Sequence, residues 1–255
     1  MLIDSSVLAT LVAKIRPLTV LHVGAHLGEE AATYGLLNAG EVHWVESQVQ
    51  LATELTNSLD SSTNFVYQAT AWSADNLELT FYETNNSQSS SVLPLKLHLE
   101  EHPAIFQARS YVVKTSRLDS ILPKKTFDLI NMDIQGAEYH ALVGLGELLR
   151  TAKVLYLEVN KREMYEGVTQ VGELDQWLKK RGFSRVVTKW PFRKGWGDAI
   201  YVTSDLRSRV PLAVLIFWAL EPLDALKRIV KRVTKNRLNP RASHPMLSSE
   251  QEDSL

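Results

Sequence analysis

The sequence predicts an α/β fold built on a mostly parallel sheet, and three observations support this prediction. Apolar, strand-like runs alternate with helix-like stretches up to about residue 203. Several runs are continuously apolar, as expected for strands that helices cover on both faces. The first run leads into a glycine turn, VLHVGAHLGEE at 20–30, of the kind that holds a nucleotide. Together they predict a Rossmann-like, doubly wound, seven-stranded sheet with an antiparallel final strand, plus a C-terminal helical extension.

Seven apolar runs are predicted to be strands, and four stretches between them are predicted to be helices. The last two strands are joined by KWPFRKGWGD at 189–198, which contains no helix, and a short connection of this kind implies an antiparallel pair. The predicted strands are 19–23, 42–46, 64–68, 127–133, 154–159, 184–188 and 199–202. The predicted helices are 29–38, 48–58, 137–149 and 171–181.

The composition is that of an ordinary globular protein without cysteine chemistry. Of 255 residues, 45% are hydrophobic and 22% charged, and none is Cys, which excludes disulfides, thiolate nucleophiles and Cys-based zinc sites. Residues 1–18 have no basic residue before Lys14 and no small-residue cleavage site, so they predict an amphipathic helix rather than a signal peptide. We therefore expect a cytoplasmic protein. The aromatic residues Trp190, Phe192 and Trp196 could stack on a sugar or cation or, by default, pack against the sheet edge. With their basic neighbours they are too few to predict a nucleic-acid surface.

Residues 84–116 interrupt the alternation and are expected to form an insertion between the third and fourth strands. The stretch is rich in Ser and Asn and becomes short and helical before Pro103. An insertion here lies at the carboxyl edge of the sheet, where ligands bind in doubly wound folds. Two interpretations stay open, a lid or substrate loop and a plain surface excursion.

The C-terminal part is predicted to lie outside the main domain, which we place at 1–206. A helical extension is expected at 207–238 and a disordered tail at 239–255. Between 207 and 241 there are nine Lys or Arg and two Asp or Glu, after an apolar run too short to span a bilayer.

The segment 210–236 allows three interpretations. It could be a helix that caps the core, a homodimer contact, or a basic amphipathic anchor on an anionic membrane surface. The last would place the protein peripherally, at the inner face of the membrane.

The glycine turn favours a nucleoside over a pyrophosphate. A dinucleotide-binding turn has G-x-G-x-x-G, and its middle glycine lets the backbone approach the pyrophosphate. Here the sequence is Gly24-Ala25-His26-Leu27-Gly28, so a histidine holds the middle position. Glu46 ends the second strand, where a carboxylate can accept both ribose hydroxyls. The alternative is that Gly24 and Gly28 only allow tight packing of the turn.

A second motif, FDLINMDIQGAEYHALVGL at 127–145, carries a family resemblance. It resembles the FkbM-type methyltransferases, whose fourth strand commonly has D-x-x-K-x-D-x-E-G-x-E followed by x-x-L-x-G. The matching residues are Asp128, Asp133, Gly136, Glu138, Leu142 and Gly144. Supporting matches are the V-G-A-x-x-G turn, QSSSVL at 88–93, SRLDSIL at 116–122, LYLEVNKREMYEG at 155–167 and WGDAIYV at 196–202. The resemblance spans about residues 18–203.

The resemblance implies a methyltransferase that moves a methyl group from S-adenosylmethionine to a hydroxyl oxygen of a sugar, glycan or related small-molecule acceptor. For the cofactor we expect Gly24, Ala25, His26, Gly28, Glu46, Ser47 and Ala71. For the acceptor we expect Ser89, Ser90, Gln135 and Glu138. For catalysis we expect Asp133, Glu158 and His140.

The catalytic assignments follow from the need to remove the proton of the acceptor hydroxyl. Asp133 and Glu158 end the fourth and fifth strands, where a carboxylate faces either the cleft or a partner such as Lys161. Asp133 could instead anchor the following helix N-terminus. Glu138 could do the same from the first helical turn, and His140 could be a surface histidine.

Three departures from the family pattern affect charge. His22 stands in place of a common Asp, Asn131 in place of a common Lys, and Gln135 in place of a common Glu. The Asn and Gln changes lower the local charge, which weakens the case for a metal. If Mg²⁺ takes part, Asp133 and Glu158 are its expected ligands.

HLEEH at 98–102 matches the H-x-x-E-H pattern of some zinc proteases. Pro103 follows directly and disfavours a continuing helix, so we interpret the match as chance.

Two other functions stay open. One is an NAD-dependent oxidoreductase, and the other is a catalytically silent protein that binds S-adenosylmethionine.

Overall fold

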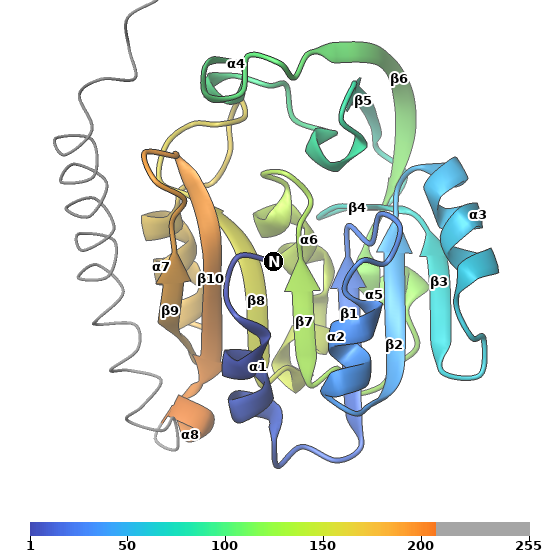
Figure 1. Cartoon of the computed structure of the whole chain (residues 1–255), viewed down its shortest axis with the longest axis vertical. Helices are drawn as coiled ribbons and strands as arrows, with labels where there is room; N and C mark the ends of the chain where they lie inside the picture. Colours follow the sequence, from blue (N-terminus) through green and yellow to red (C-terminus); the bar gives the residue numbers. More distant parts are fainter. Residues whose placement is uncertain (208–255) are drawn as a thin grey trace, which may run out of the picture. The chain divides into compact units, whose positions relative to one another are not determined.

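A seven-stranded sheet forms the centre of the computed structural model, which describes residues 1–207 (Figure 1). Six strands run in one direction, and β10, the last in the chain, is antiparallel to both of its neighbours, β8 and β9. The predicted antiparallel final strand is confirmed, and it lies inside the sheet rather than at its edge. In sheet order the strands are β3 (Asn64–Gln68), β2 (Ala39–Glu46), β1 (Leu18–Val23), β7 (Leu129–Met132), β8 (Val154–Asn160), β10 (Trp196–Thr203) and β9 (Phe183–Lys189).

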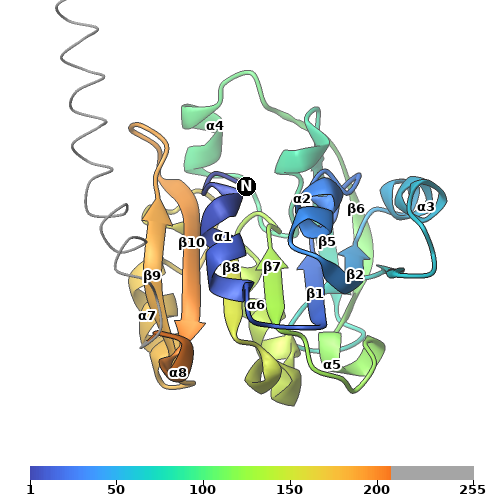
Figure 2. The same cartoon turned by 60° about the horizontal axis from the view of Figure 1, so that its bottom comes forward.

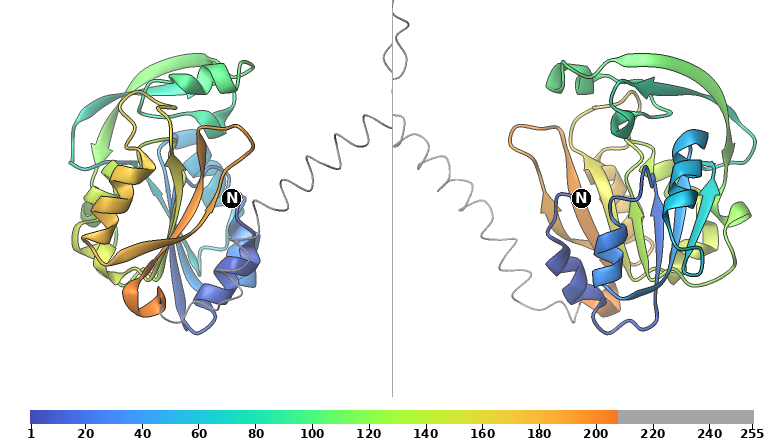
Figure 3. Two further views of the ribbon diagram at one scale, coloured as in Figure 1. Left: turned by 90° about the vertical axis from the view of Figure 1, so that its left-hand side faces the viewer. Right: turned by 45° about the vertical axis from the view of Figure 1, so that its right-hand side comes forward.

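Helices cover both faces of this sheet, as the continuously apolar strands predict. Figure 3 shows α1 and α7 on opposite sides of it. One face packs Leu118, Leu142 and Leu178 against the strands, and all three side chains are fully buried or nearly so. The helices are α1 (Ser5–Val12), α2 (Ala31–Leu36), α3 (Val49–Ser58), α4 (Leu97–Glu101), α5 (Leu118–Ile121), α6 (Glu138–Gly144), α7 (Val171–Lys179), α8 (Ser204–Arg207) and the 3₁₀ helices η1 (Ser87–Ser89) and η2 (Gly146–Thr151).

Two sequence predictions differ from the observed elements. The helix predicted at 137–149 ends at Gly144 and continues as η2, because Gly146 takes a left-handed conformation (φ +51°) that breaks the helix. The insertion begins earlier than expected and contains a second sheet, of order β4-β6-β5, from β4 (Thr70–Ala71), β5 (Glu78–Thr84) and β6 (Gln107–Ser116).

The insertion lies over the carboxyl ends of the main strands, as Figures 1 and 2 show. The short helix expected before Pro103 is α4. Strand β6 has no apolar run because most of its side chains are exposed, which is why the sequence pattern did not reveal it.

The expected helical extension after Arg207 and the tail at 239–255 lie outside the described residues. Within residues 1–207, no helix has the length and apolar character needed to cross a membrane.

The sheet order reverses between β1 and β7, and this is the point where a doubly wound fold binds its ligand. The two strand ends touch through Gly24, whose φ is +86°. A Cβ atom added there would lie 2.0 Å from the carbonyl oxygen of Asp133. Only glycine fits, so the first turn and the end of β7 form one packed unit.

We predict that Gly24→Ala lowers the free energy of unfolding by more than about 2 kcal/mol, because it adds both backbone strain and a clash with backbone. Gly35→Ala is the matched control, since Gly35 lies in exposed α2 with nothing within 4 Å of an added Cβ. This control should gain about 0.5–1 kcal/mol from helix propensity. Urea denaturation measures both values, and equal stability of the two variants would contradict the packing argument.

Candidate active site

A cavity of about 360 Å³ opens where the carboxyl ends of β1, β2, β7 and β8 meet the insertion. Ten of the residues expected at a site line it, which are Gly24, His26, Glu46, Ser47, Ala71, Ser89, Ser90, Asp133, Gln135 and Glu158. They come from segments up to 134 residues apart, so the fold gathers most of the predicted site in one place.

Glu46 holds the glycine turn in place. Its Oε2 accepts a hydrogen bond from the His26 amide at 2.9 Å, and its Oε1 accepts one from the Gln48 amide at 2.8 Å. Burial raises the pKa of Glu46, whereas these amides lower it. A carboxylate has about four acceptor positions, so backbone amides do not use all of them, and Glu46 can also accept from a ligand at the end of β2.

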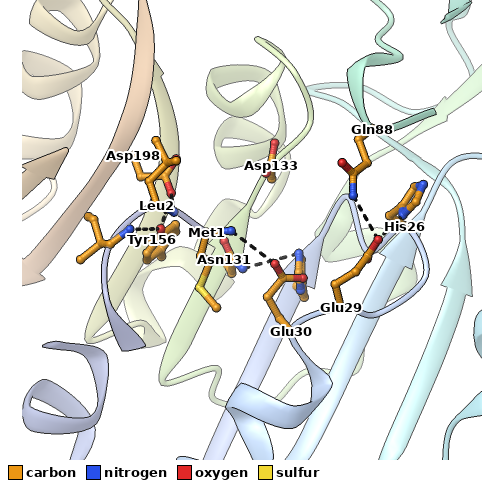
Figure 4. Close-up of polar contacts among 12 residues, drawn as sticks. Met1, Leu2, His26, Glu29, Glu30, Gln88, Asn131, Asp133, Tyr156 and Asp198 are labelled. Carbon is orange, nitrogen blue, oxygen red and sulfur yellow. Dashed lines mark hydrogen bonds and ion pairs between the residues drawn. The ribbon is translucent and has the colours of Figure 1, made fainter. Parts of the chain in front are cut away.

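His26 and Glu29 join the glycine turn to the insertion, and Figure 4 shows Glu29 in contact with both His26 and Gln88. The Nδ1 of His26 lies 2.6 Å from Glu29 Oε1, and its Nε2 lies 2.7 Å from Ser87 Oγ. Gln88 Nε2 also donates to Glu29 Oε1, at 3.1 Å. The histidine that replaces the middle glycine therefore closes one side of the cavity.

Gln135 lies at the centre of the acidic part of the cavity. Its Nε2 donates to Asp133 Oδ1 at 2.7 Å and to Glu158 Oε2 at 2.9 Å. The Tyr165 hydroxyl donates to Gln135 Oε1, and Ser91 Oγ donates to the Gln135 carbonyl oxygen at 2.8 Å. One amide thus holds both carboxylates in fixed positions.

The two carboxyl groups are less acidic than ordinary ones. Burial and the negative charge of nearby Asp198 raise the pKa of Asp133 to about 6. Burial and the charge of Asp133 raise the pKa of Glu158 well above its ordinary value. Both carboxyl groups therefore hold their protons to higher pH than exposed carboxyl groups do, because burial and mutual repulsion disfavour their charged forms.

A neutral polar network lies behind the acidic part, in the sheet. The Asn131 Nδ2 donates to the Tyr34 hydroxyl at 2.8 Å, and that hydroxyl lies 3.1 Å from His22 Nδ1. Burial lowers the pKa of His22 to about 3, so its imidazole is uncharged at neutral pH. The Oδ1 of Asn131 is buried and has no hydrogen-bond partner.

The first residues of the chain reach the same cavity (Figure 4). Met1 lines it, with its amino group 3.5 Å from Glu30 Oε1. The Leu2 amide donates to Asp198, whose carboxylate also accepts from the Tyr156 hydroxyl.

Four expected site residues do not line the cavity. Ala25 is buried in the turn, and Gly28 packs on α3, since a Cβ there would lie 2.6 Å from Leu55 Cδ1. Glu138 is buried, and its Oε1 accepts from the amides of Ile134 and Gly136, so it braces the turn after β7. His140 stacks on Trp72, with ring centroids 3.7 Å apart.

Sequence analysis did not predict that rings from three separate segments form one aromatic wall of the cavity, although it considered Trp196 as a residue that could stack on a sugar. The wall consists of Tyr165, Trp196, His98 and His102, all of which line the cavity. Tyr165 belongs to the LYLEVNKREMYEG match and Trp196 to WGDAIYV, so the family motifs contained a signal for two of the four. In the part of the chain that the structure describes, no group of three or more His, Cys, Asp or Glu residues forms a potential metal site.

A family model of the methyltransferase FkbM domain matches residues 22–185. The chain belongs to this family. The matched range includes the glycine turn, Asp133, Gln135 and Glu158, so the cavity of this FkbM-domain protein lies almost entirely within the family's shared region.

A curated relative is 2-O-methyltransferase NoeI from Sinorhizobium fredii (strain NBRC 101917 / NGR234). It is 35% identical over 82 residues, which cover 31% of this chain and 34% of the relative. The match thus spans about a third of that protein's length.

Solved methyltransferase structures are also similar to this FkbM-domain protein. Magnesium protoporphyrin IX methyltransferase (ChlM) from Synechocystis PCC 6803 with bound SAM has a TM-score of 0.44 and 14% identity, over 78% of this chain and 77% of that one. A SAM dependent methyltransferase from Aquifex aeolicus has a TM-score of 0.44 and 17% identity, over 79% of this chain and 91% of that chain.

We predict that Gln135→Glu destabilises this FkbM-domain protein more at pH 8 than at pH 5. The variant places three carboxyl groups in contact, which raises their folded-state pKa values above the unfolded ones. The folded state then binds more protons than the unfolded state, so stability is lost as the pH rises through the folded pKa values. We expect a loss of about 1–3 kcal/mol at pH 8.

Gln88→Glu is the control, because it adds the same charge next to Glu29 at an exposed position. Its effect should stay below about 0.5 kcal/mol. Thermal unfolding at both pH values measures the difference, and equal losses at pH 5 and pH 8 in Gln135→Glu would argue against close contact of the carboxyl groups.

Proposed function

We propose that this FkbM-domain protein transfers a methyl group from S-adenosylmethionine to a hydroxyl oxygen of a sugar or glycan. One observation carries the proposal. Asp133, whose carboxyl pKa is raised by burial to about 6, lines the same cavity as Gly24 and His26 of the glycine turn that would hold the cofactor. A proton acceptor and a nucleoside-type turn therefore share one cavity.

The residues of the turn fit S-adenosylmethionine. Gly24 lines the cavity without a side chain, and Glu46 lines it at the end of β2, where a carboxylate can accept ribose hydroxyls. His26 occupies the position where a pyrophosphate would need a bare backbone, which argues against NAD. When bound, the cofactor supplies an electrophilic methyl group on a sulfonium.

Asp133 acts as the general base in the proposed reaction. It would take the proton of the acceptor hydroxyl as the hydroxyl oxygen bonds to the methyl carbon and the carbon–sulfur bond of the sulfonium breaks, which leaves a neutral thioether, so no further co-reactant is needed. Gln135 orients the Asp133 carboxylate through the 2.7 Å hydrogen bond. The same Gln135 amide donates to Glu158 at 2.9 Å, so the two carboxyl groups are held side by side in the cavity.

The oxygen acceptor and its sugar character have separate support. NoeI is described as a 2-O-methyltransferase, which favours a hydroxyl acceptor for its relative. The cavity wall combines hydroxyl side chains at 89–91 with aromatic rings, and this combination suits a ring that carries several hydroxyl groups.

We predict that Glu46→Ala weakens binding of S-adenosylmethionine by about 1–3 kcal/mol, because the hydrogen bonds lost go to a charged acceptor. Glu41→Ala is the control, since Glu41 lies on the same strand, outside the cavity, and pairs with Lys125. Calorimetry with S-adenosylmethionine and NAD measures both variants and the wild type. Unchanged affinity in Glu46→Ala would contradict the ribose role, and tighter binding of NAD would overturn the cofactor assignment.

We predict that Asp133→Asn lowers turnover by about 10²–10⁴-fold, the range for loss of a general base, while cofactor affinity changes little. In the wild type, kcat/KM should rise with pH up to about 6 and then level, since the carboxylate form is the active one. The variant should lack this acidic limb.

The assay follows methyl incorporation by mass into methyl glycosides and a glycan fraction. Stimulation by Mg²⁺ with inhibition by a chelator would instead assign the carboxylates to a metal. Turnover of wild-type size in Asp133→Asn would exclude Asp133 as the base.

A further inference from the structure

The histidines of the HLEEH segment lie in the cavity, on α4 and directly after it. His98 and His102 both line it, with ring centroids 4.8 Å apart and the rings stacked at 27°. The His98 ring also lies beside the Tyr165 ring, with centroids 5.4 Å apart, and the His102 ring lies beside the Trp196 ring, with centroids 6.4 Å apart. Four rings therefore form one continuous wall.

His98 has hydrogen-bonding capacity that the protein leaves unused. Its side chain is 5% exposed, and its Nδ1 has no partner. Burying a polar atom without a partner costs free energy, so such an atom in a cavity wall is suited to a ligand. Burial lowers the pKa of His98 to about 4, so at neutral pH the ring has one N–H donor and one nitrogen acceptor.

The hydrogen-bond donor of the His102 ring is its Nδ1–H group, because Nε2 accepts a hydrogen bond within the protein. Trp196 Nε1 donates to His102 Nε2 at 3.4 Å, so a neutral His102 carries its proton on Nδ1. A sugar hydroxyl both donates and accepts, and it can therefore exchange hydrogen bonds with either imidazole.

The rest of the segment fixes the two rings in place. The Glu101 carboxylate accepts from the Gly195 amide at 3.0 Å and from Arg162 Nη1 at 2.9 Å. The Lys194 ammonium donates to the Glu101 carbonyl oxygen at 2.6 Å, and the His98 amide donates to the Met164 carbonyl oxygen at 3.1 Å. The glutamate of the zinc-like pattern is thus occupied in anchoring α4.

Tyr165 links this wall to the proton acceptor. Its ring contacts His98, and its hydroxyl donates to Gln135, whose amide holds Asp133. The imidazole wall and the proposed base therefore belong to one chain of contacts within the same cavity.

We propose that His98 and His102, together with Trp196, form the acceptor subsite, in which a sugar ring packs on the aromatic wall and exchanges hydrogen bonds with the imidazoles. This inference rests on the proposed O-methyltransferase function. It names the residues that select the acceptor, and it assigns a role to a segment that otherwise matches only a metal-site pattern by chance.

The test compares His98→Phe and His102→Phe with the wild type, using methyl glycosides of glucose, galactose, mannose, fucose and N-acetylglucosamine. Phenylalanine keeps a ring but removes both nitrogens. We expect KM for the glycoside to rise about tenfold, as for one lost hydrogen bond. We expect kcat to be nearly unchanged and the affinity for S-adenosylmethionine to stay within about twofold of the wild type.

His98→Gln keeps a donor and an acceptor, so its KM should be within about threefold of the wild-type value. This variant also covers the case in which His98→Phe does not fold.

Leu99→Phe is the matched control, because it adds the same ring on α4 outside the cavity. It should leave KM unchanged. An unchanged KM in folded His98→Phe and His102→Phe, with an active wild type, would overturn the subsite alone. A wild type that binds S-adenosylmethionine but methylates no glycoside and no glycan fraction would overturn the sugar acceptor, and the subsite with it.

Discussion

The site depends on one close approach, that of Gly24 to the backbone of Asp133. No side chain fits between them, because an added Cβ would lie 2.0 Å from the Asp133 carbonyl oxygen. The Gly24 amide donates to Val45 and the Asp133 amide to Val23, so the turn is bonded to the strands on either side. The ends of β2, β1 and β7 are therefore one rigid unit, and the proposed base keeps a fixed distance from the nucleoside-type turn.

This rigid unit tolerates the departures from the family pattern because two of them compensate each other. His22 and Asn131 lie directly opposite in the register of β1 and β7, where the resemblance predicts an Asp and a Lys. Replacing only one would leave a buried charge without a partner, which is strongly destabilising. Here both positions are neutral and share Tyr34. Gln135 likewise replaces a third carboxylate by an amide that donates to the two that remain.

The sequence predicted the parts of the molecule that short-range patterns encode. Apolar runs located all seven strands of the main sheet, and residues at strand ends, such as Glu46 and Asp133, were correctly expected at its carboxyl edge. The exposed strand β6 has no such run. Glu138 and His140 show the other limit, because helical spacing does not reveal whether a side chain braces a turn, stacks on Trp72 or faces a cavity. Tyr165 and Trp196 lie in family motifs, but their contacts with His98 and His102 join segments far apart in the chain, and no local pattern predicts such contacts.

The insertion forms hydrogen bonds both with the glycine turn and with the acidic part of the cavity, and these bonds help to align the two parts of the site. At the turn, Ser87 contacts His26 and Gln88 donates to Glu29. At the acidic end, Ser91 Oγ donates to the Gln135 carbonyl oxygen, and α4 is anchored through Glu101 to the loop that precedes β10. A segment bonded at both ends cannot shift at one without straining the other. The residues that would surround a nucleoside and those that would surround an acceptor are therefore held in register by the same stretch of chain, which is what an in-line transfer between two bound molecules requires.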